Sequence, residues 1–396
     1  MKERLTIRNF GPITDMDVQI RTFTIFIGSQ GSGKSTVAKV LTICHDVNWY
    51  LQILDKDKDI LEPFKKFCID EYFRNNTYIR YLNDSGEVEI VYQEGEFQLN
   101  FDGLTEKEAK DLFSRKILEA NKGFLTRMGI VDVDDVGIGE KYAPLLRANA
   151  RTMLYVPAER NLVGTMSNAL ASMMAAKIPL YDALVEYMSV FEKAKNEFKE
   201  YYVPFLDVSF SMSDGVERIW LGQGESKRTP LPLHACSSGL QSVLPLLMSL
   251  DYSLNTVCFD AFVLEEPEQN LFPSNQRELI NHLAEVYNAM EVYGMVFTTH
   301  SPYILSCMNV VMMAGKLIND SDLYDEVVAI TGENHYLDPS MVSAYRLDPQ
   351  ADEFCVNLIN PKTGLIGINP LDVASEFIGE DFDRLYQLYV KMLRKK

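Results

Sequence analysis

Apolar and polar residues alternate along much of the first hundred residues, which is the pattern of strands with one buried face. The alternation covers residues 3–8 and 15–20, with a turn at 9–12 between them. Three further alternating segments, joined by short Gly-containing connections, lie at 78–82, 87–92 and 96–101. Because such connections are hairpin signals, the sequence predicts an antiparallel meander at about 77–101.

Elsewhere the apolar runs are continuous, which is the pattern of strands buried on both faces. These runs lie at 23–27, 152–156, 256–264 and 294–299. Segments with helical spacing follow several of them, and residues 205–221 return to strand-like alternation. Strands that alternate with helices predict an α/β fold with a mostly parallel core sheet and a ligand at the carboxyl ends of its strands.

The domain organisation follows from where the helical spacing is densest. Residues 162–202 are rich in Met and Ala, and we interpret them as a helical insertion. The core is then formed by 1–161 and 203–320, and residues 321–396 are expected to pack on it as a C-terminal extension.

One loop in this pattern carries a phosphate-binding motif. The strand at 23–27 runs into GSQGSGKST, which fits G-x-x-x-x-G-K-[ST] and is followed by a helix. Glycines let the backbone wrap around phosphate oxygens, and the helix N-terminus attracts the anion. Lys34 is expected to reach the β- and γ-phosphates, and the Ser35 hydroxyl to ligate Mg²⁺. The residues expected to bind the nucleotide here are Gly28, Ser29, Gln30, Gly31, Ser32, Gly33, Lys34, Ser35 and Thr36.

Composition narrows the class of protein. No apolar run is long enough to span a membrane and the start has no signal-peptide pattern, so we expect a cytoplasmic protein without a membrane partner. Six scattered cysteines without a C-x-x-C pair favour reduced, mostly buried thiols. The net charge of −18 does not favour nucleic acid as a partner. We interpret the basic candidates Lys193–Lys195, Arg127 and 391–396 as solvated surface.

Three further motifs lie in the second half of the chain. The sequence SSGLQ at 237–241 precedes an apolar helix, the strand at 256–264 runs into EEPEQN, and the strand at 294–299 runs into HSP. In this order, together with the phosphate loop, they resemble the ABC-type ATPases, and within them the SMC, RecF and OLD-like group. The opening IRNFGPI at 7–13 resembles that group's N-terminal strand and turn. The resemblance implies an ABC-type ATPase head with ATP and Mg²⁺ as cofactors.

The resemblance also implies roles for the matched acids and the histidine. Glu265 stands where the family places the carboxylate that holds Mg²⁺ together with Ser35. Glu266 stands at the position of the catalytic base, which polarises the attacking water, and His300 matches the switch histidine that senses the γ-phosphate. Two adjacent acids at the end of one strand suit a cation and a water separately.

Ser238, Gly239 and Gln241 align with the signature loop, which in this family binds the γ-phosphate of ATP held by the opposite subunit. Leu240 stands in place of the usual second glycine, and a capped core helix is the alternative interpretation. Residues 268–271 correspond to the loop that crosses the dimer interface. The implied mechanism is head-to-head dimerisation on ATP, hydrolysis and release.

The sequence PAER at 157–160 resembles a feature of stand-alone ATPases, several of which belong to antiphage defence systems. For Arg160 two roles are open: contact with phosphate or the partner subunit, or a salt bridge at the strand end.

Three biological roles of the ATP-driven motion are considered. We favour a nucleotide-gated regulator or scaffold that controls a separate effector protein in bacterial antiphage defence. The alternative is a RecF- or SMC-like DNA-binding ATPase in repair, which needs a basic surface and a long arm. An ATPase with its own nuclease is disfavoured, because Asp320 and Asp322 lack the preceding strand of a TOPRIM site and are interpreted as a helix cap.

Overall fold

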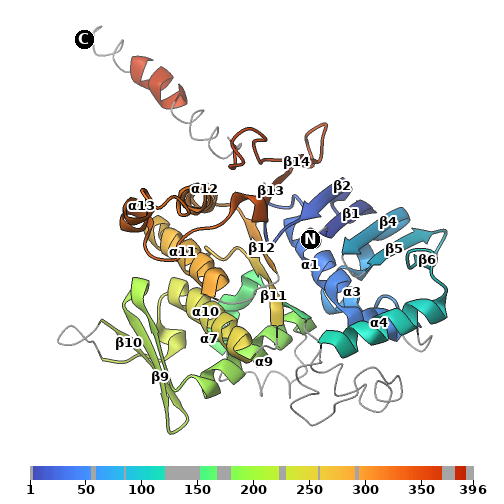
Figure 1. Cartoon of the computed structure of the whole chain (residues 1–396). Helices are drawn as coiled ribbons and strands as arrows, with labels where there is room; N and C mark the ends of the chain where they lie inside the picture. The colour runs from blue at the N-terminus through green and yellow to red at the C-terminus, as the bar shows by residue number, and fades with distance from the viewer. Residues whose placement is uncertain are drawn as a thin grey trace.

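The computed structural model describes residues 3–54, 59–83, 86–120, 152–166, 180–222, 229–256, 259–289, 294–367 and 380–388. Its centre is a six-stranded sheet with helices on both sides (Figure 1). In sheet order the strands are β14 (Cys355–Asn357), β13 (Val342–Leu347), β3 (Phe23–Gly28), β12 (Gly294–Thr299), β11 (Phe259–Glu265) and β7 (Thr152–Val156). All neighbouring pairs are parallel except β13 and β14.

The continuous apolar runs form strands because both faces of this sheet are covered. Phe23 and Ile25 of β3 pack into a core shared with three helices on one face, α10 (Ser238–Thr256), α11 (Pro273–Ala289) and α12 (Pro302–Leu317). Phe26 points to the opposite face and packs with α1 (Lys34–His45). The predicted mixed α/β fold with a mostly parallel core sheet is therefore confirmed.

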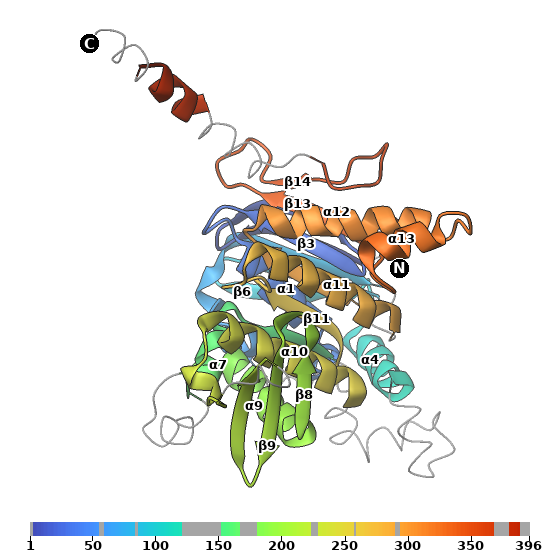
Figure 2. The same cartoon turned by 90° about the vertical axis from the view of Figure 1, so that its left-hand side faces the viewer.

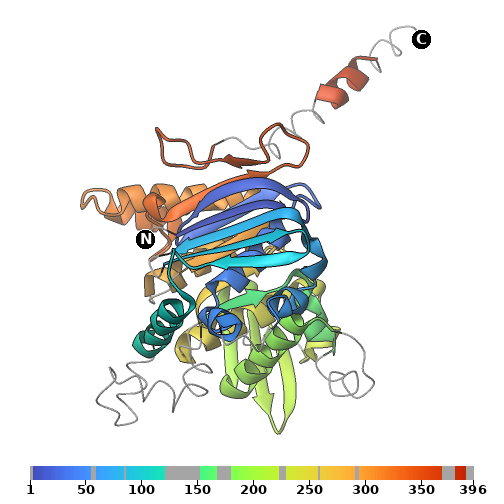
Figure 3. The ribbon, with the colours of Figure 1, turned by 90° about the vertical axis from the view of Figure 1, so that its right-hand side faces the viewer.

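A five-stranded antiparallel sheet lies on the α1 side of the molecule and is drawn in blue and cyan in Figure 3. Its order is β2 (Ile13–Ile20), β1 (Glu3–Phe10), β4 (Phe73–Asn83), β5 (Gly86–Gln93) and β6 (Glu96–Asn100). The predicted N-terminal strands and the meander at about 77–101 are thus confirmed. Three helices lie on this side as well: α2 (Val47–Leu54), α3 (Glu62–Lys66) and α4 (Glu106–Ala120).

The region predicted as a helical insertion contains two described helices, α7 (Asn161–Met166) and α9 (Asp182–Glu197). The helix-rich stretch ends earlier than expected, because Glu200–Val203 is strand β8, which pairs with β9 (Val208–Ser213). Strand β10 (Val216–Leu221) completes a three-stranded antiparallel sheet (Figure 2). The division of the chain into a core, an insertion and an extension stays a prediction.

Lys195 on α9 is a correction to the interpretation of Lys193–Lys195 as solvated surface. Its side chain is buried, and the ammonium lies 2.7 Å from Glu192 and 3.6 Å from Glu217. The two carboxylates compensate the desolvated charge. The other basic candidates, Arg127 and 391–396, lie outside the described residues.

The C-terminal part supplies a strand to the core sheet as well as helices. After α12 come α13 (Tyr324–Thr331) and then β13, which inserts beside β3. Asp320 accepts a hydrogen bond from the backbone N–H of Asp322 in a turn before α13, and α13 has no side-chain cap, so the helix-cap interpretation is wrong.

None of the helices described is long and apolar enough to cross a membrane. The five described cysteines are free thiols, of which only Cys44 is buried, so the expectation of mostly buried thiols is wrong for this part of the chain.

Candidate nucleotide site at the carboxyl edge of the core sheet

Three neighbouring parallel strands bring the separate motifs together. The phosphate loop follows β3, the Glu265–Glu266 pair ends β11, and His300 follows β12, which lies between them. Glu265 is in register with Thr298, and Thr299 with Ile27. Because parallel strands end at one edge, residues more than two hundred positions apart in sequence face one site.

The phosphate loop has the backbone that its glycines require. Gly31 and Gly33 have φ values of 75° and 95°, which side-chain-bearing residues rarely adopt. A Cβ on Gly28 would lie 2.3 Å from the carbonyl oxygen of Leu347 in β13, so this close approach needs glycine. Strand β13, which was not predicted, therefore forms one wall of the loop.

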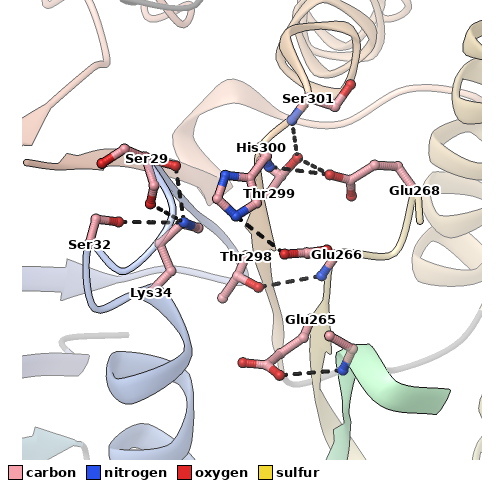
Figure 4. A network of polar contacts seen from close by, with 12 residues as sticks. Ser29, Ser32, Lys34, Glu265, Glu266, Glu268, Thr298, Thr299, His300 and Ser301 are labelled. Carbon is pink, nitrogen blue, oxygen red and sulfur yellow. Dashed lines mark hydrogen bonds and ion pairs between the residues drawn. The ribbon is translucent and has the colours of Figure 1, made fainter. Parts of the chain in front are cut away.

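Lys34 opens α1 and folds back over the loop. Its ammonium donates hydrogen bonds to the carbonyls of Gly28 and Ser29 at 3.0 and 2.9 Å, and is almost completely buried. Burial lowers the pKa of Lys34 to about 8, although the nearby charges of Glu266 and Glu265 act in the opposite direction. Figure 4 shows the Lys34 side chain, the His300 ring and the Glu266 carboxylate pointing toward one another. A buried cation here is suited to an anionic ligand.

One buried carboxylate oxygen of Glu265 is available to a metal ion. Its side chain is 3% exposed, yet Oε1 has no hydrogen-bond partner among the described residues, and Oε2 accepts only a 3.4 Å bond from the N–H of Ala158. Burying a carboxylate oxygen without a hydrogen-bond partner is costly, so the site fits a cation. The exposed Ser35 in the first turn of α1 offers a hydroxyl. Within the described ranges, no group of three or more His, Cys, Asp or Glu is arranged so that it could hold a metal ion by itself, so a hard cation here would also need phosphate oxygens as ligands.

Glu266 is held in contact with His300. Nε2 of His300 lies 3.3 Å from Oε1 of Glu266, and both side chains are about one-third exposed. This contact is the main cause of the lowered pKa of Glu266, so the group is a carboxylate at neutral pH. An ionised acid that is open to solvent can accept a hydrogen bond from water and orient it.

The turn after β11 is strained at Glu266, where φ is 42°. The backbone N–H of Glu266 donates to the carbonyl of Thr298 at 2.8 Å. Arg160 fixes the other side of the turn, because its guanidinium donates to the carbonyls of Glu265 at 2.6 Å and Glu266 at 2.5 Å. A left-handed turn at a non-Gly residue persists when its surroundings hold it in this way.

The structure therefore gives Arg160 a role different from the two considered, which is to hold the turn after β11. The side chain is fully buried in the single chain, so it does not face the phosphate site, and its described hydrogen bonds go to backbone carbonyls rather than to a carboxylate. The sequence signal for Arg160 is the PAER segment at 157–160, which follows the short strand at 152–156.

Replacing Arg160 by Met should lower the free energy of unfolding by about 2–4 kcal/mol, because two buried carbonyls lose their donors. The measurement is denaturant unfolding of both proteins. Arg277→Met is the matched control. Arg277 is exposed, and it donates a hydrogen bond to one backbone carbonyl, that of Ile330. The control should change stability by less than about 0.5 kcal/mol. Equal losses in the two variants would contradict the structural role of Arg160.

Glu268 differs from its expected place in an interface-crossing loop. It is 7% exposed, and its Oε1 accepts bonds from the Thr299 hydroxyl at 2.5 Å and the His300 N–H at 3.3 Å. Burial raises the pKa of Glu268. It thus positions His300 from below, while Asn270 and Phe272 are the exposed residues of this loop.

The residues aligned with the signature loop lie at the start of α10. Ser238 is exposed, and a Cβ on Gly239 would lie 2.8 Å from the carbonyl oxygen of Asn270. The Gln241 amide is buried and donates to the carbonyls of His234 and Cys236, both at 2.9 Å. The structure thus joins this loop to the loop after β11, and contact with a nucleotide stays a prediction for all three residues.

The comparisons agree with this geometry. The family model of the AAA ATPase domain matches residues 1–134 and 160–305, well over half of the chain. OLD nuclease of Thermus scotoductus is 22% identical over 340 residues, which cover 76% of this chain and 59% of that protein. The chain thus spans less than two thirds of this curated relative. The resemblance to the SMC, RecF and OLD-like group is confirmed by these matches.

Solved structures of SMC heads are also similar. The SMC head domain from Thermotoga maritima is 14% identical, with a TM-score of 0.39 over 78% of this chain and 92% of that one. A Pyrococcus furiosus Smc head domain bound to the C-terminal domain of ScpA is 12% identical, with a TM-score of 0.39 over 95% of this chain and 98% of that one.

Proposed function

Because the chain belongs to the family of AAA ATPase domains, we propose that it hydrolyses ATP at a composite site that forms when two copies meet head to head. We further propose that this ATP-dependent assembly regulates a separate effector protein in antiphage defence. The observation that carries the proposal is the meeting of Lys34, Glu265, Glu266 and His300 at the ends of three adjacent strands.

Each residue has one task in this proposal. Lys34 and the loop N–H groups hold the β- and γ-phosphates, and Ser35 and Glu265 hold Mg²⁺. When bound there, Mg²⁺ would supply positive charge that stabilises the phosphate oxygens. Glu266 accepts a hydrogen bond from the attacking water and orients it, and His300 keeps the Glu266 carboxylate in place. Positioning and charge stabilisation are the main requirements of phosphoryl transfer.

The proposal of a composite site rests on what the loops expose. Gly239 packs against Asn270, so the signature-like loop and the loop after β11 form one surface. Ser238, Asn270 and Phe272 are exposed on it, and Phe272 is 73% exposed. A large aromatic side chain that is free in the single chain is suited to burial at an interface. Ser238 is then available to the nucleotide of the partner copy.

The role in regulating an effector rests on less specific support. The net charge of −18 disfavours binding along DNA, and the PAER segment resembles a feature of stand-alone ATPases, several of which belong to antiphage defence systems. The alternative, a RecF- or SMC-like ATPase that binds DNA, makes a separate prediction for duplex DNA in the experiment below.

The test is complementation between two inactive variants, Lys34→Ala and Ser238→Arg. The first binds ATP weakly and lacks the ammonium that contacts the phosphates, and the second places a bulky cation where the partner's γ-phosphate would lie. Each alone should hydrolyse ATP at a rate reduced by on the order of 10²-fold or more, whereas the mixture should regain a partial rate, since a mixed dimer has one intact composite site. The wild-type rate per subunit should also rise with protein concentration.

One control variant and two outcomes make the experiment decisive. Ser321→Arg, at an exposed serine beyond the end of α12 that is farther from His300, tests whether a surface arginine by itself lowers the rate. A mixture without activity, together with a rate per subunit that is independent of concentration, would refute the composite site. Strong stimulation by duplex DNA would support the DNA-binding alternative.

A further inference from the structure

An apolar groove lies on the opposite side of α12 from the core. It has a volume of about 580 Å³, and its lining includes Val310, Met313, Leu317, Val327, Ile330 and Leu365. Two of its walls are α12 and α13, and the third is the segment at 360–367. This segment is tied to α12, because the Asn309 side chain exchanges two hydrogen bonds with the backbone of Ile366, both at 2.8 Å. The groove is therefore formed before anything enters it.

Helix α12 has a second apolar stripe that its packing in the core does not explain. Its first stripe, which includes Met308 and Met312, is buried against the sheet. The second contains Val310 and Met313, which are 41% and 43% exposed, and Ile330 of α13 across the groove is 69% exposed. Surface helices normally present polar residues to solvent, and a contiguous apolar patch marks an interaction site.

The C-terminal segment of the chain has a matching pattern. Residues 380–388 are helical, and Phe382, Leu385 and Tyr386 are exposed. The sequence continues the same spacing with Tyr389, Met392 and Leu393. Positions i, i+3, i+4, i+7, i+10 and i+11 form one face of a helix, and such a face binds in hydrophobic grooves.

We propose that residues 382–393 dock as a helix in the groove between α12 and α13 of their own chain. Gly367 lines the groove, and residues 368–379 connect it to this segment, so docking is intramolecular and has a millimolar effective concentration. Charge favours the same pairing. Lys391 lies within the segment and Arg394, Lys395 and Lys396 follow it, whereas α13 and the turn before it present the exposed acids Asp320, Asp322, Asp325 and Glu326.

The proposal goes beyond the nucleotide site and does not depend on it. Figure 2 shows α12 running beneath the segment that follows β14, the segment from which the chain continues to its C-terminal helix. A docked segment covers Met313 and Ile330 and hides its own aromatic residues. The chain then has a closed form with these two apolar surfaces removed from water.

The test is amide hydrogen exchange in the full chain at micromolar concentration without nucleotide. Residues 382–393 should exchange about tenfold or more slowly in wild type than in Met313→Glu, which places a charge in the groove. Leu385→Glu should have the reciprocal effect and speed exchange in α13. Val216→Glu is the matched control, because Val216 is 49% exposed on β10, away from the groove, and should leave the segment protected.

Three outcomes would overturn the proposal. The first is equally fast exchange of 382–393 in wild type and Met313→Glu. The second is protection that increases with protein concentration, which would assign the groove to a second copy of the chain. The third is loss of protection in Val216→Glu as well. Met313 and Val216 are both exposed, so equal melting temperatures confirm that both variants fold.

Discussion

Replacing Glu266 by Gln should lower the rate of ATP hydrolysis by about 10²–10⁴-fold, the range in which a positioned proton acceptor contributes. Gln has nearly the same volume, so the strained turn at φ 42° and its bond to Thr298 should persist. What is lost is the negative charge that orients the attacking water. Nucleotide binding should change little, because Lys34 and Glu265 are untouched.

The measurement is steady-state hydrolysis together with nucleotide affinity for wild type and variant. Glu285→Gln is the matched control, because Glu285 also lies beside a histidine, with Oε2 3.8 Å from Nε2 of His335, and it is on α11 away from the phosphate loop. Sizing with ATP should reveal a dimer or larger assembly only in the Glu266 variant. Unchanged hydrolysis would remove Glu266 from the mechanism, whereas a parallel loss of binding would reveal a damaged loop.

The site was predictable wherever its residues follow their strand directly. The phosphate loop, Glu265–Glu266 and His300 each come at the end of an apolar strand, so the local pattern gives both the residue and its position. A parallel sheet then places strand ends at one edge, and no side-chain detail is needed to expect that the motifs meet.

What the sequence did not reveal depends on contacts between distant segments. Strand β13 is short, and its local sequence pattern does not show which strand of the sheet it pairs with. The pairing with β3 is seen only in the structure. For Arg160 the sequence leaves open a contact with phosphate or the partner subunit and a salt bridge at the strand end, and it places Glu268 in the loop that crosses the dimer interface, yet both side chains are buried and hold the backbone of the site. A charged residue is expected at the surface unless hydrogen-bond partners compensate its burial. The partners here are backbone carbonyls and a threonine hydroxyl that lie far from these residues in the sequence, so the sequence does not reveal them.

The nucleotide affinity should depend on pH through Lys34. In the free protein, burial lowers the pKa of this ammonium to about 8. Bound phosphate stabilises the charged form, so the pKa in the complex is higher. The sign follows from linkage: below pH 8 the group is protonated in both states and adds no pH dependence. Above pH 8 binding must take up a proton, and the affinity falls by up to about tenfold per pH unit until the pKa of the complex is reached.

Titration of ATP binding between pH 7 and 10 at constant Mg²⁺ and ionic strength measures this effect. A phosphate group with a second pKa of about 6 is already mostly ionised at pH 7, so its own titration contributes little in this window. Lys34→Ala should bind on the order of 10²-fold more weakly, the loss expected for hydrogen bonds to a charged group, and its affinity should be flat over the same range. Lys39→Ala, which removes a lysine whose ammonium donates to the carbonyl of Phe67, should retain the wild-type profile. An equal decline in Lys34→Ala would show that another group takes up the proton, and the buried ammonium would then have no part in binding the phosphates.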